Sequence, residues 1–137
     1  VYPGIKELLR VLTKQGILCL VATSKPEIYA KKILDYYKLR TYFHYIAGAN
    51  MDGTRTDKAE VIAYALKQIP AEYNNKKILM VGDRSHDIIG AKKNGIDCAG
   101  VLFGYGSREE LEGAGADFVA DSVEAVKNIV FSDIARN

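Results

Sequence analysis

The chain alternates between uninterrupted apolar runs and segments in which apolar residues recur at helical spacing. The runs Ile17–Ala22 and Ile78–Val81 are typical of strands that are buried on both faces of a parallel sheet. Cys98–Phe103 is a third such run, Tyr42–Ala47 is a weaker aromatic one, and Phe118–Ala120 is long enough only for an edge strand. The pattern predicts a sheet of short strands.

Amphipathic helices are predicted between these strands. The first carries Ile5, Leu8, Leu9 and Leu12 on one face and ends at Gly16. Further helices are expected to begin at Pro26 and at Lys58, and another is expected to run through Ile88, Ile89 and Ala91. The pairs Ser107 with Glu110 and Asp121 with Glu124 have the spacing of helix-capping pairs. Helices that alternate with strands indicate an α/β fold, and with no linker or repeat the simplest partition is one domain over residues 1–137.

Composition narrows the classes of partner. The 19 basic and 17 acidic residues are spread along the chain and leave a net charge of +2, so nucleic acid is not expected as a ligand. No run approaches the roughly 20 apolar residues of a membrane span, and we expect a cytoplasmic protein with no membrane contact. Cys19 and Cys98 lie in apolar runs, as reduced buried thiols do.

Two carboxylates follow the strand predicted at Ile78–Val81. Asp83 comes directly after Gly82, at the carboxyl end of the strand, where ligands collect in open parallel sheets. Asp87 lies four residues further on, so the two carboxylates are close enough to share a site. Carboxylates that share a site need a divalent cation, a lysine or a shared proton. The alternative is that both residues only shape a turn and the start of a helix.

Two other strand ends carry polar groups. Thr23 and Ser24 follow the run Ile17–Ala22, and Lys58 stands at the N-terminal end of a helix, where a cation opposes the helix dipole. A hydroxyl with backbone N–H groups, a lysine and a metal-binding acid are what a phosphoryl group requires. A solvated surface lysine is the alternative for Lys58 taken alone.

Three segments resemble, in order and spacing, the second, third and fourth motifs of the haloacid-dehalogenase-like hydrolases. They are Val21–Pro26 (VATSKP), Thr56–Lys58 (TDK) and Val81–Asp87 (VGDRSHD). The resemblance is strongest to the phosphoglycolate-phosphatase-like branch, in which Tyr2-Pro3-Gly4 is similar to the re-entry into the core after a helical cap domain. It implies a doubly wound, mostly parallel sheet of the Rossmann-like kind.

The resemblance also implies roles for particular residues. Thr23 would hydrogen-bond the phosphoryl oxygens with help from the Ser24 backbone N–H, and Lys58 would neutralise the nucleophile and the phosphate. Asp83 would bind Mg²⁺, and Asp87 would bind it through water or orient Lys58. These roles agree with the oxygen ligands that Mg²⁺ prefers.

One family feature has no counterpart in the sequence. Members attack phosphorus with an aspartate of a D-x-D motif at the end of their first strand, and no apolar strand here ends in such a motif. Asp52-Gly53-Thr54 follows Ala49-Asn50-Met51 instead, and we interpret it as a loop. We therefore expect the C-terminal part of a Mg²⁺-dependent phosphatase of small phosphorylated metabolites, without the first central strand and the cap, and inactive alone.

In the sheet that the resemblance implies, the absent strand would lie between the strands at Ile17–Ala22 and Ile78–Val81. Its absence would leave two apolar edges for self-association or for a partner's strand. The main alternative function is accordingly a non-catalytic interaction module that completes its sheet with a partner. A receiver-like signalling domain ranks last, because the strand candidate before Gly48 ends without an acceptor aspartate.

Overall fold

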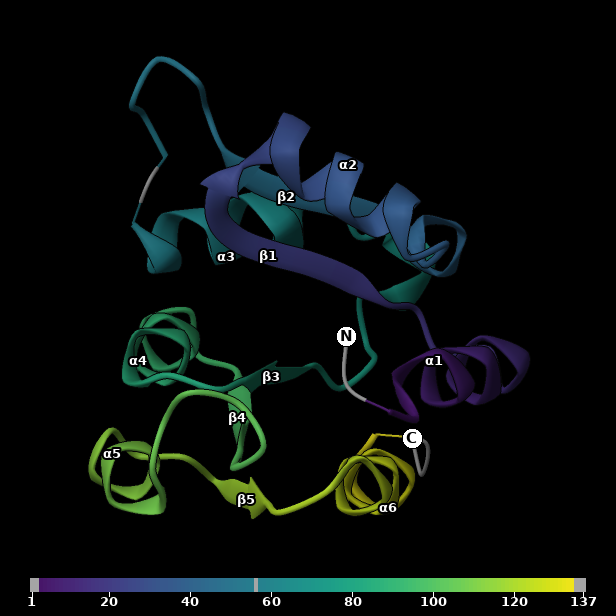
Figure 1. Ribbon diagram of the computed structural model, residues 1–137, viewed down its shortest axis with the longest axis vertical. Helices are drawn as coiled ribbons and strands as arrows, with labels where there is room; N and C mark the ends of the chain where they lie inside the picture. The colour runs from purple at the N-terminus through teal and green to yellow at the C-terminus, as the bar shows by residue number, and fades with distance from the viewer. Residues whose placement is uncertain (1–2, 56, 135–137) are drawn as a thin grey trace. The chain divides into compact units, whose positions relative to one another are not determined.

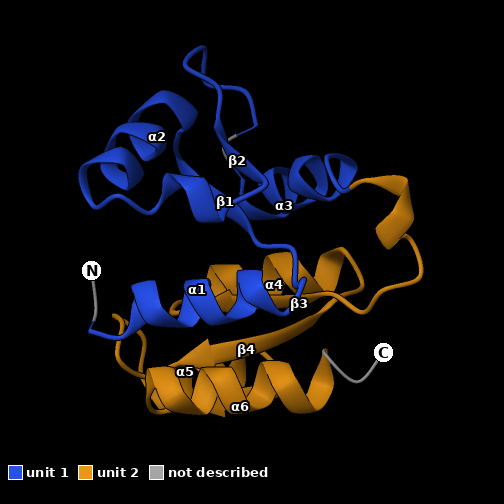
Figure 2. Cartoon of the chain, turned by 90° about the vertical axis from the view of Figure 1, so that its right-hand side faces the viewer, with its two compact units in different colours: residues 1–69 blue, residues 70–137 orange. Residues whose placement is uncertain are grey.

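The computed structural model describes residues 3–55 and 57–134, which fall into two compact units, residues 1–69 and 70–137 (Figure 2). Each unit has its own sheet and its own helices. Thr56 of the segment Thr56–Lys58 and Tyr2 of the re-entry-like Tyr2-Pro3-Gly4 lie outside the described residues.

Unit 1 is built on a two-stranded parallel sheet, β1–β2. Its elements are α1 (Ile5–Lys14), β1 (Leu20–Pro26), α2 (Glu27–Tyr36), the 3-10 helix η1 (Arg40–Tyr42), β2 (Tyr45–Ala49) and α3 (Lys58–Lys67). Both α2 and α3 contact both strands, and Figure 2 shows them on opposite sides of the sheet. Ala47, Val61 and Ala65 form a buried cluster between β2 and α3.

Unit 2 is built on a three-stranded parallel sheet in the order β3-β4-β5. Its elements are the 3-10 helix η2 (Ala71–Tyr73), β3 (Leu79–Gly82), α4 (Ser85–Lys93), β4 (Asp97–Val101), α5 (Arg108–Gly113), β5 (Phe118–Ala120) and α6 (Val123–Asp133). Figure 1 shows α4 and α5 on one side of this sheet and α6 on the other. Ile88, Ala91, Cys98 and Leu111 form the buried core under α4 and α5.

The predicted α/β class with parallel strands is confirmed, and helices cover both faces of each sheet. β1 and β3 are terminal strands of separate sheets within the described residues, as expected if a strand between them is absent. The expectation of burial on both faces is wrong at Val81, which is 41% exposed. Met80 packs against the core under α4, so Val81 faces the other side of the sheet, where α6 contacts β5.

The first strand begins later than its apolar run predicts. Gly16 adopts a positive φ of 78°, and the Ile17 N–H donates back to Leu12 O (3.0 Å), so Ile17 takes part in the turn that closes the end of α1. β1 instead continues through Thr23 and Ser24, which the apolar run placed after the end of the strand. The described part of the chain has no helix long and apolar enough to cross a membrane.

Candidate functional site

Thr23 and Ser24 lie in an irregular stretch of β1. The pairing of β1 with β2 joins Ala22 to Ala47 and then Pro26 to Ala49, so β1 takes four steps along the chain where β2 takes two. The two additional residues form a bulge in β1, a feature that redirects side chains near functional sites. Within the bulge, the Thr23 hydroxyl accepts a hydrogen bond from Lys25 N (3.2 Å), which leaves the hydroxyl hydrogen for donation to an anion.

Lys58 is the first residue of α3, as the sequence predicts, and its side chain is half-buried. Asp57 caps this helix, because its carboxylate accepts a hydrogen bond from Ala59 N (3.1 Å). The preceding Asp52–Thr54 segment is a loop, as predicted: Asp52 Oδ1 accepts from the Thr54 backbone N–H (3.0 Å) and hydroxyl (2.7 Å). Lys58 therefore stands at the junction of a structured loop and a capped helix.

Asp83 and Asp87 lie close together in unit 2: Asp83 is in the turn between β3 and α4, and Asp87 is the third residue of α4. Asp87 is 4% exposed, and its Oδ2 accepts hydrogen bonds from the backbone N–H groups of Asp83 (3.0 Å) and Arg84 (3.2 Å). Asp83 Oδ2 accepts from Tyr105 N (3.1 Å), in the loop between β4 and α5. Asp87 thus fixes the backbone that presents Asp83.

Two glycines lie against these carboxylates. A Cβ at Gly82 would overlap the Asp87 side chain, and a Cβ at Gly104 would overlap the Asp83 side chain. Such contacts are closer than any real Cβ makes. Both glycines therefore make room for an acid, a role that the sequence alone does not indicate.

The oxygen-only donor set of this turn fits Mg²⁺. Among the described residues there is no group of three or more His, Cys, Asp or Glu side chains that could hold a metal ion. Mg²⁺ commonly keeps several waters and needs only one or two carboxylates together with substrate phosphate. Asp83 would be the ligand, and Asp87 would support it through the shared turn.

The predicted site residues are thus divided between the two units. Thr23, Ser24 and Lys58 belong to unit 1, and Asp83 and Asp87 belong to unit 2. Within each unit the structure places them at the carboxyl end of a strand or at the helix start that follows it. Their convergence on one phosphoryl group stays a prediction.

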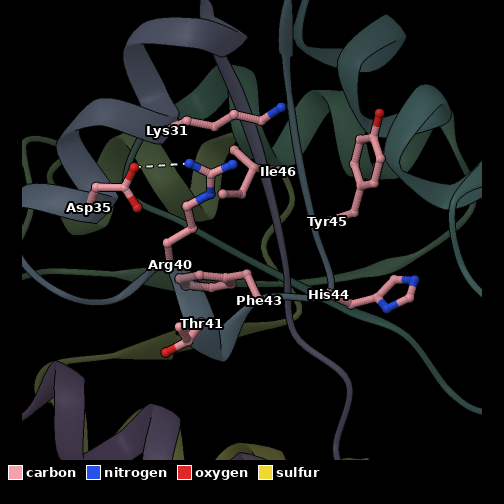
Figure 3. A pocket seen from close by; sticks show the side chains of 8 residues that line it. All are labelled: Lys31, Asp35, Arg40, Thr41, Phe43, His44, Tyr45 and Ile46. Carbon is pink, nitrogen blue, oxygen red and sulfur yellow. Dashed lines mark hydrogen bonds and ion pairs between the residues drawn. The ribbon is translucent and has the colours of Figure 1, made fainter.

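A cavity of about 490 Å³ lies elsewhere in unit 1 (Figure 3). It is lined by Lys31, Asp35, Arg40, Thr41, Phe43, His44, Tyr45 and Ile46. In Figure 3 the Arg40 guanidinium points toward the Asp35 carboxylate, with which it pairs at 2.9 Å. The cavity lies at the start of β2, whereas the bulge of the parallel strand β1 is paired with the end of β2, so the cavity is separate from Thr23 and Ser24.

Sequence reasoning missed the side chains that brace the site. Glu110 was expected to complete a capping pair with Ser107; Ser107 Oγ does accept from Glu110 N (3.1 Å), but the Glu110 carboxylate accepts from Ser85 N (2.7 Å) and Arg84 Nε (3.0 Å). These donors lower the pKa of Glu110, the Ser85 backbone N–H having the larger effect. The capping motif gave no signal of this contact across 25 residues.

The chain matches one protein-family model and several known proteins. A family model described as haloacid dehalogenase-like hydrolase matches residues 1–101. A 5'-nucleotidase of Pseudomonas aeruginosa is 43% identical over 113 residues, which are 81% of this chain and 49% of that protein. The tyrosine-protein kinase PtkA of Mycobacterium tuberculosis is 42% identical over 112 residues, which are 81% of this chain and 38% of that protein.

The fold agrees with solved structures. A protein described as a predicted phosphatase from Clostridium acetobutylicum has a TM-score of 0.89 and 41% identity over 96% of this chain and 60% of its own. Phosphoglycolate phosphatases of Pseudomonas putida and Pseudomonas fluorescens also match, at 29% and 34% identity over 92% and 77% of this chain. The chain spans about half the length of the 5'-nucleotidase and less of the kinase.

Proposed function

Because the chain belongs to the haloacid dehalogenase-like hydrolase family, we propose that it is the part of a phosphate-monoester hydrolase that binds the phosphoryl group and Mg²⁺. The observation that carries this proposal is the turn after β3. There a buried Asp87 holds the backbone N–H groups of Asp83 and Arg84, and two glycines make room for the acids. The bond from the Arg84 N–H to Asp87 is also part of the capping box that begins α4, but a capping box does not require the room that Gly104 leaves beside Asp83.

Each proposed role follows from chemistry. The Thr23 hydroxyl and the Ser24 backbone N–H donate to phosphoryl oxygens, and the Lys58 ammonium offsets the charge of the phosphate and of the attacking group. Asp83 holds Mg²⁺, and Asp87 positions Asp83. When bound, Mg²⁺ supplies positive charge to phosphoryl oxygens in the transition state. The substrates are small phosphorylated metabolites, with phosphoglycolate and nucleotide or sugar phosphates as the first to test.

The chain has no aspartate in a strand-end D-x-D motif, so we propose that it does not turn over substrate alone. The purified chain, incubated with Mg²⁺ and p-nitrophenyl phosphate, is expected to release no phenolate above the buffer rate. Robust turnover by the chain would contradict this part of the proposal.

The proposed site is tested in a longer protein that contains the chain and a nucleophile strand. There Lys58→Met is expected to lower kcat/KM about a hundredfold or more, because a charge that stabilises the transition state is lost. Lys67→Met, at the exposed other end of α3, is the matched control and should leave kcat/KM unchanged. Equal effects of the two substitutions would exclude Lys58 from the site.

A second candidate is a module that completes its sheet with a strand from another chain or from a second copy. The terminal positions of β1 and β3 favour it, because an apolar strand with an unpaired edge is a template for pairing. The two candidates are compatible if the added strand carries the nucleophile.

A further inference from the structure

We propose that Arg55 is a positioning residue that holds the bulge of β1 and the loop before Lys58 in their mutual arrangement. This inference rests on the proposed function, because Thr23, Ser24 and Lys58 are the groups that the arrangement would present to phosphate. Arg55 is not part of the three family-like segments, and it touches none of the proposed ligands in the contacts described below.

Arg55 makes three different contacts inside unit 1. Its Nε donates to the Gly48 carbonyl (2.9 Å), its guanidinium lies 3.7 Å from the centre of the Tyr64 ring, and its Nη2 is 3.8 Å from Glu27 Oε1. The side chain is only 18% exposed. A planar, permanently charged group can stack and donate at the same time, which an ammonium cannot do as well.

The Gly48 carbonyl marks where the bulge begins. It lies between Ala47 and Ala49, in the interval where the register of β1 against β2 shifts. A Cβ at Gly48 would come within 2.7 Å of Lys25 O and of Glu27 Cα, so the bulge and the start of α2 pack directly on this residue. Arg55 therefore holds the strand against which the bulge rests.

The contact with Glu27 places the positive charge of Arg55 beside a carboxylate. Glu27 begins α2 directly after the bulge, and Oε1 is a buried oxygen that accepts no hydrogen bond from the described residues. An unneutralised carboxylate there would repel a phosphate beside Thr23 and Ser24. Arg55 on one side and Lys31 Nζ at 3.4 Å on the other offset this charge.

The other side of the arrangement is the loop that leads to Lys58. Arg55 has a positive φ of 53°, an uncommon conformation outside glycine that surrounding contacts must maintain. Its stack on Tyr64 ties this loop to α3, and Tyr64 OH in turn lies 2.9 Å from Tyr45 OH on β2. Arg55 thus links the loop that leads to Lys58 both to α3 and to the strand beside the bulge.

The test uses the purified chain with Arg55→Gln, Arg55→Lys and a control, Arg10→Gln. Arg10 is an exposed arginine of unit 1 paired with Glu7, so its loss removes the same charge without touching the bulge. ¹⁵N relaxation measures the backbone order parameters of residues 23–25 and 50–55, and titration with inorganic phosphate measures shifts of the Ser24 and Lys58 amides. For Arg55→Gln we expect order parameters to fall from about 0.85 toward 0.6, and the phosphate Kd to rise about tenfold. Arg55→Lys should be intermediate and Arg10→Gln unchanged.

Unchanged order parameters in Arg55→Gln would overturn the inference, and so would lower order with an unchanged phosphate Kd. If the unsubstituted chain shows no phosphate shifts at Ser24 and Lys58, the proposed function fails, and the order parameters alone judge Arg55. If Arg55→Gln does not fold, the same order parameters are compared between Tyr64→Leu and Tyr64→Phe. Phe keeps the stacked ring and should preserve the order parameters, whereas Leu removes the ring and should lower them; equal effects would overturn the inference.

Discussion

The Asp83 and Asp87 carboxylates occupy space that any larger residue at Gly104 or Gly82 would need. The two acids could be found from the sequence, but the residues that support them could not. Asp83 and Asp87 stand in a recognisable pattern after a strand. Gly104 and Tyr105 support Asp83 from a loop about twenty residues away, through a contact that only the folded chain creates.

Gly104→Ala should displace the Asp83 side chain. We expect it to lower the free energy of unfolding by about 1–3 kcal/mol, as overpacking does, and to weaken the Mg²⁺-induced shifts of the Asp83 amide in an NMR titration. Gly113→Ala is the control, because a Cβ at Gly113 meets no atom within 4 Å and alanine favours the helix it ends. Equal unfolding free energies and Mg²⁺ responses for both variants would show that Asp83 does not depend on Gly104.

Asp117 provides a pH-dependent test of unit 2. Lys92 Nζ at 2.6 Å, and then the Cys98 N–H at 2.8 Å, lower the pKa of this carboxyl. Its stabilising effect is complete above the unfolded pKa of about 3.9 and is lost as the pH falls through the lower folded pKa. Asp117→Asn should therefore lower the unfolding free energy by about 1 kcal/mol at pH 7, a small value because Lys92 is partly exposed. Urea unfolding measures the free-energy difference between Asp117→Asn and the unsubstituted chain, which should shrink toward zero near pH 2. An equal free-energy difference at pH 7 and pH 2 would argue against this role of Asp117.

At the scale of the element, periodicity predicted the helices better than the strands. The spacing of Ile5, Leu8, Leu9 and Leu12 identified α1 because a helix face is a local property. The bounds of β1 and β2 depend on pairing between strands, so the bulge at Thr23 and Ser24 could not be read from either strand alone. Neighbouring polar residues can also compete to cap a helix. The cap predicted at Asp121 is instead supplied by Ser122.

The cap of α6 is tested by a pair of neighbouring substitutions. Ser122 Oγ accepts a hydrogen bond from Ala125 N (3.0 Å). Ser122→Ala should cost about 1 kcal/mol of unfolding free energy, because that N–H loses its partner. Asp121→Ala should cost clearly less, since it removes only a charge near the helix start. Chemical denaturation measures both, and the reverse order would restore Asp121 as the cap.

At the scale of the whole molecule, the proposal requires a strand with a D-x-D motif that this sequence does not contain. Family resemblance predicted an absent strand, and the described residues leave β1 and β3 as terminal strands. The sequence does not identify what could pair with those edges, because strand pairing is made by backbone groups, which every segment carries. An added strand would bury Val81, which is exposed on β3.

The edge of β3 is therefore the place to test addition of a strand. We expect the chain to associate with itself at high concentration, or to bind a synthetic peptide whose apolar strand ends in Asp-x-Asp, with phosphatase activity appearing only when the peptide is bound. Val81→Lys should abolish either association, because a lysine on the terminal strand opposes pairing. Ile89→Lys, at a comparably exposed position on α4, is the control and should leave association unchanged. Light scattering measures self-association, and peptide titration measures peptide binding. If β3 accepts the strand, association must be sensitive to a charge at Val81 but not at Ile89. Equal behaviour of the two variants would therefore place any association elsewhere on the chain.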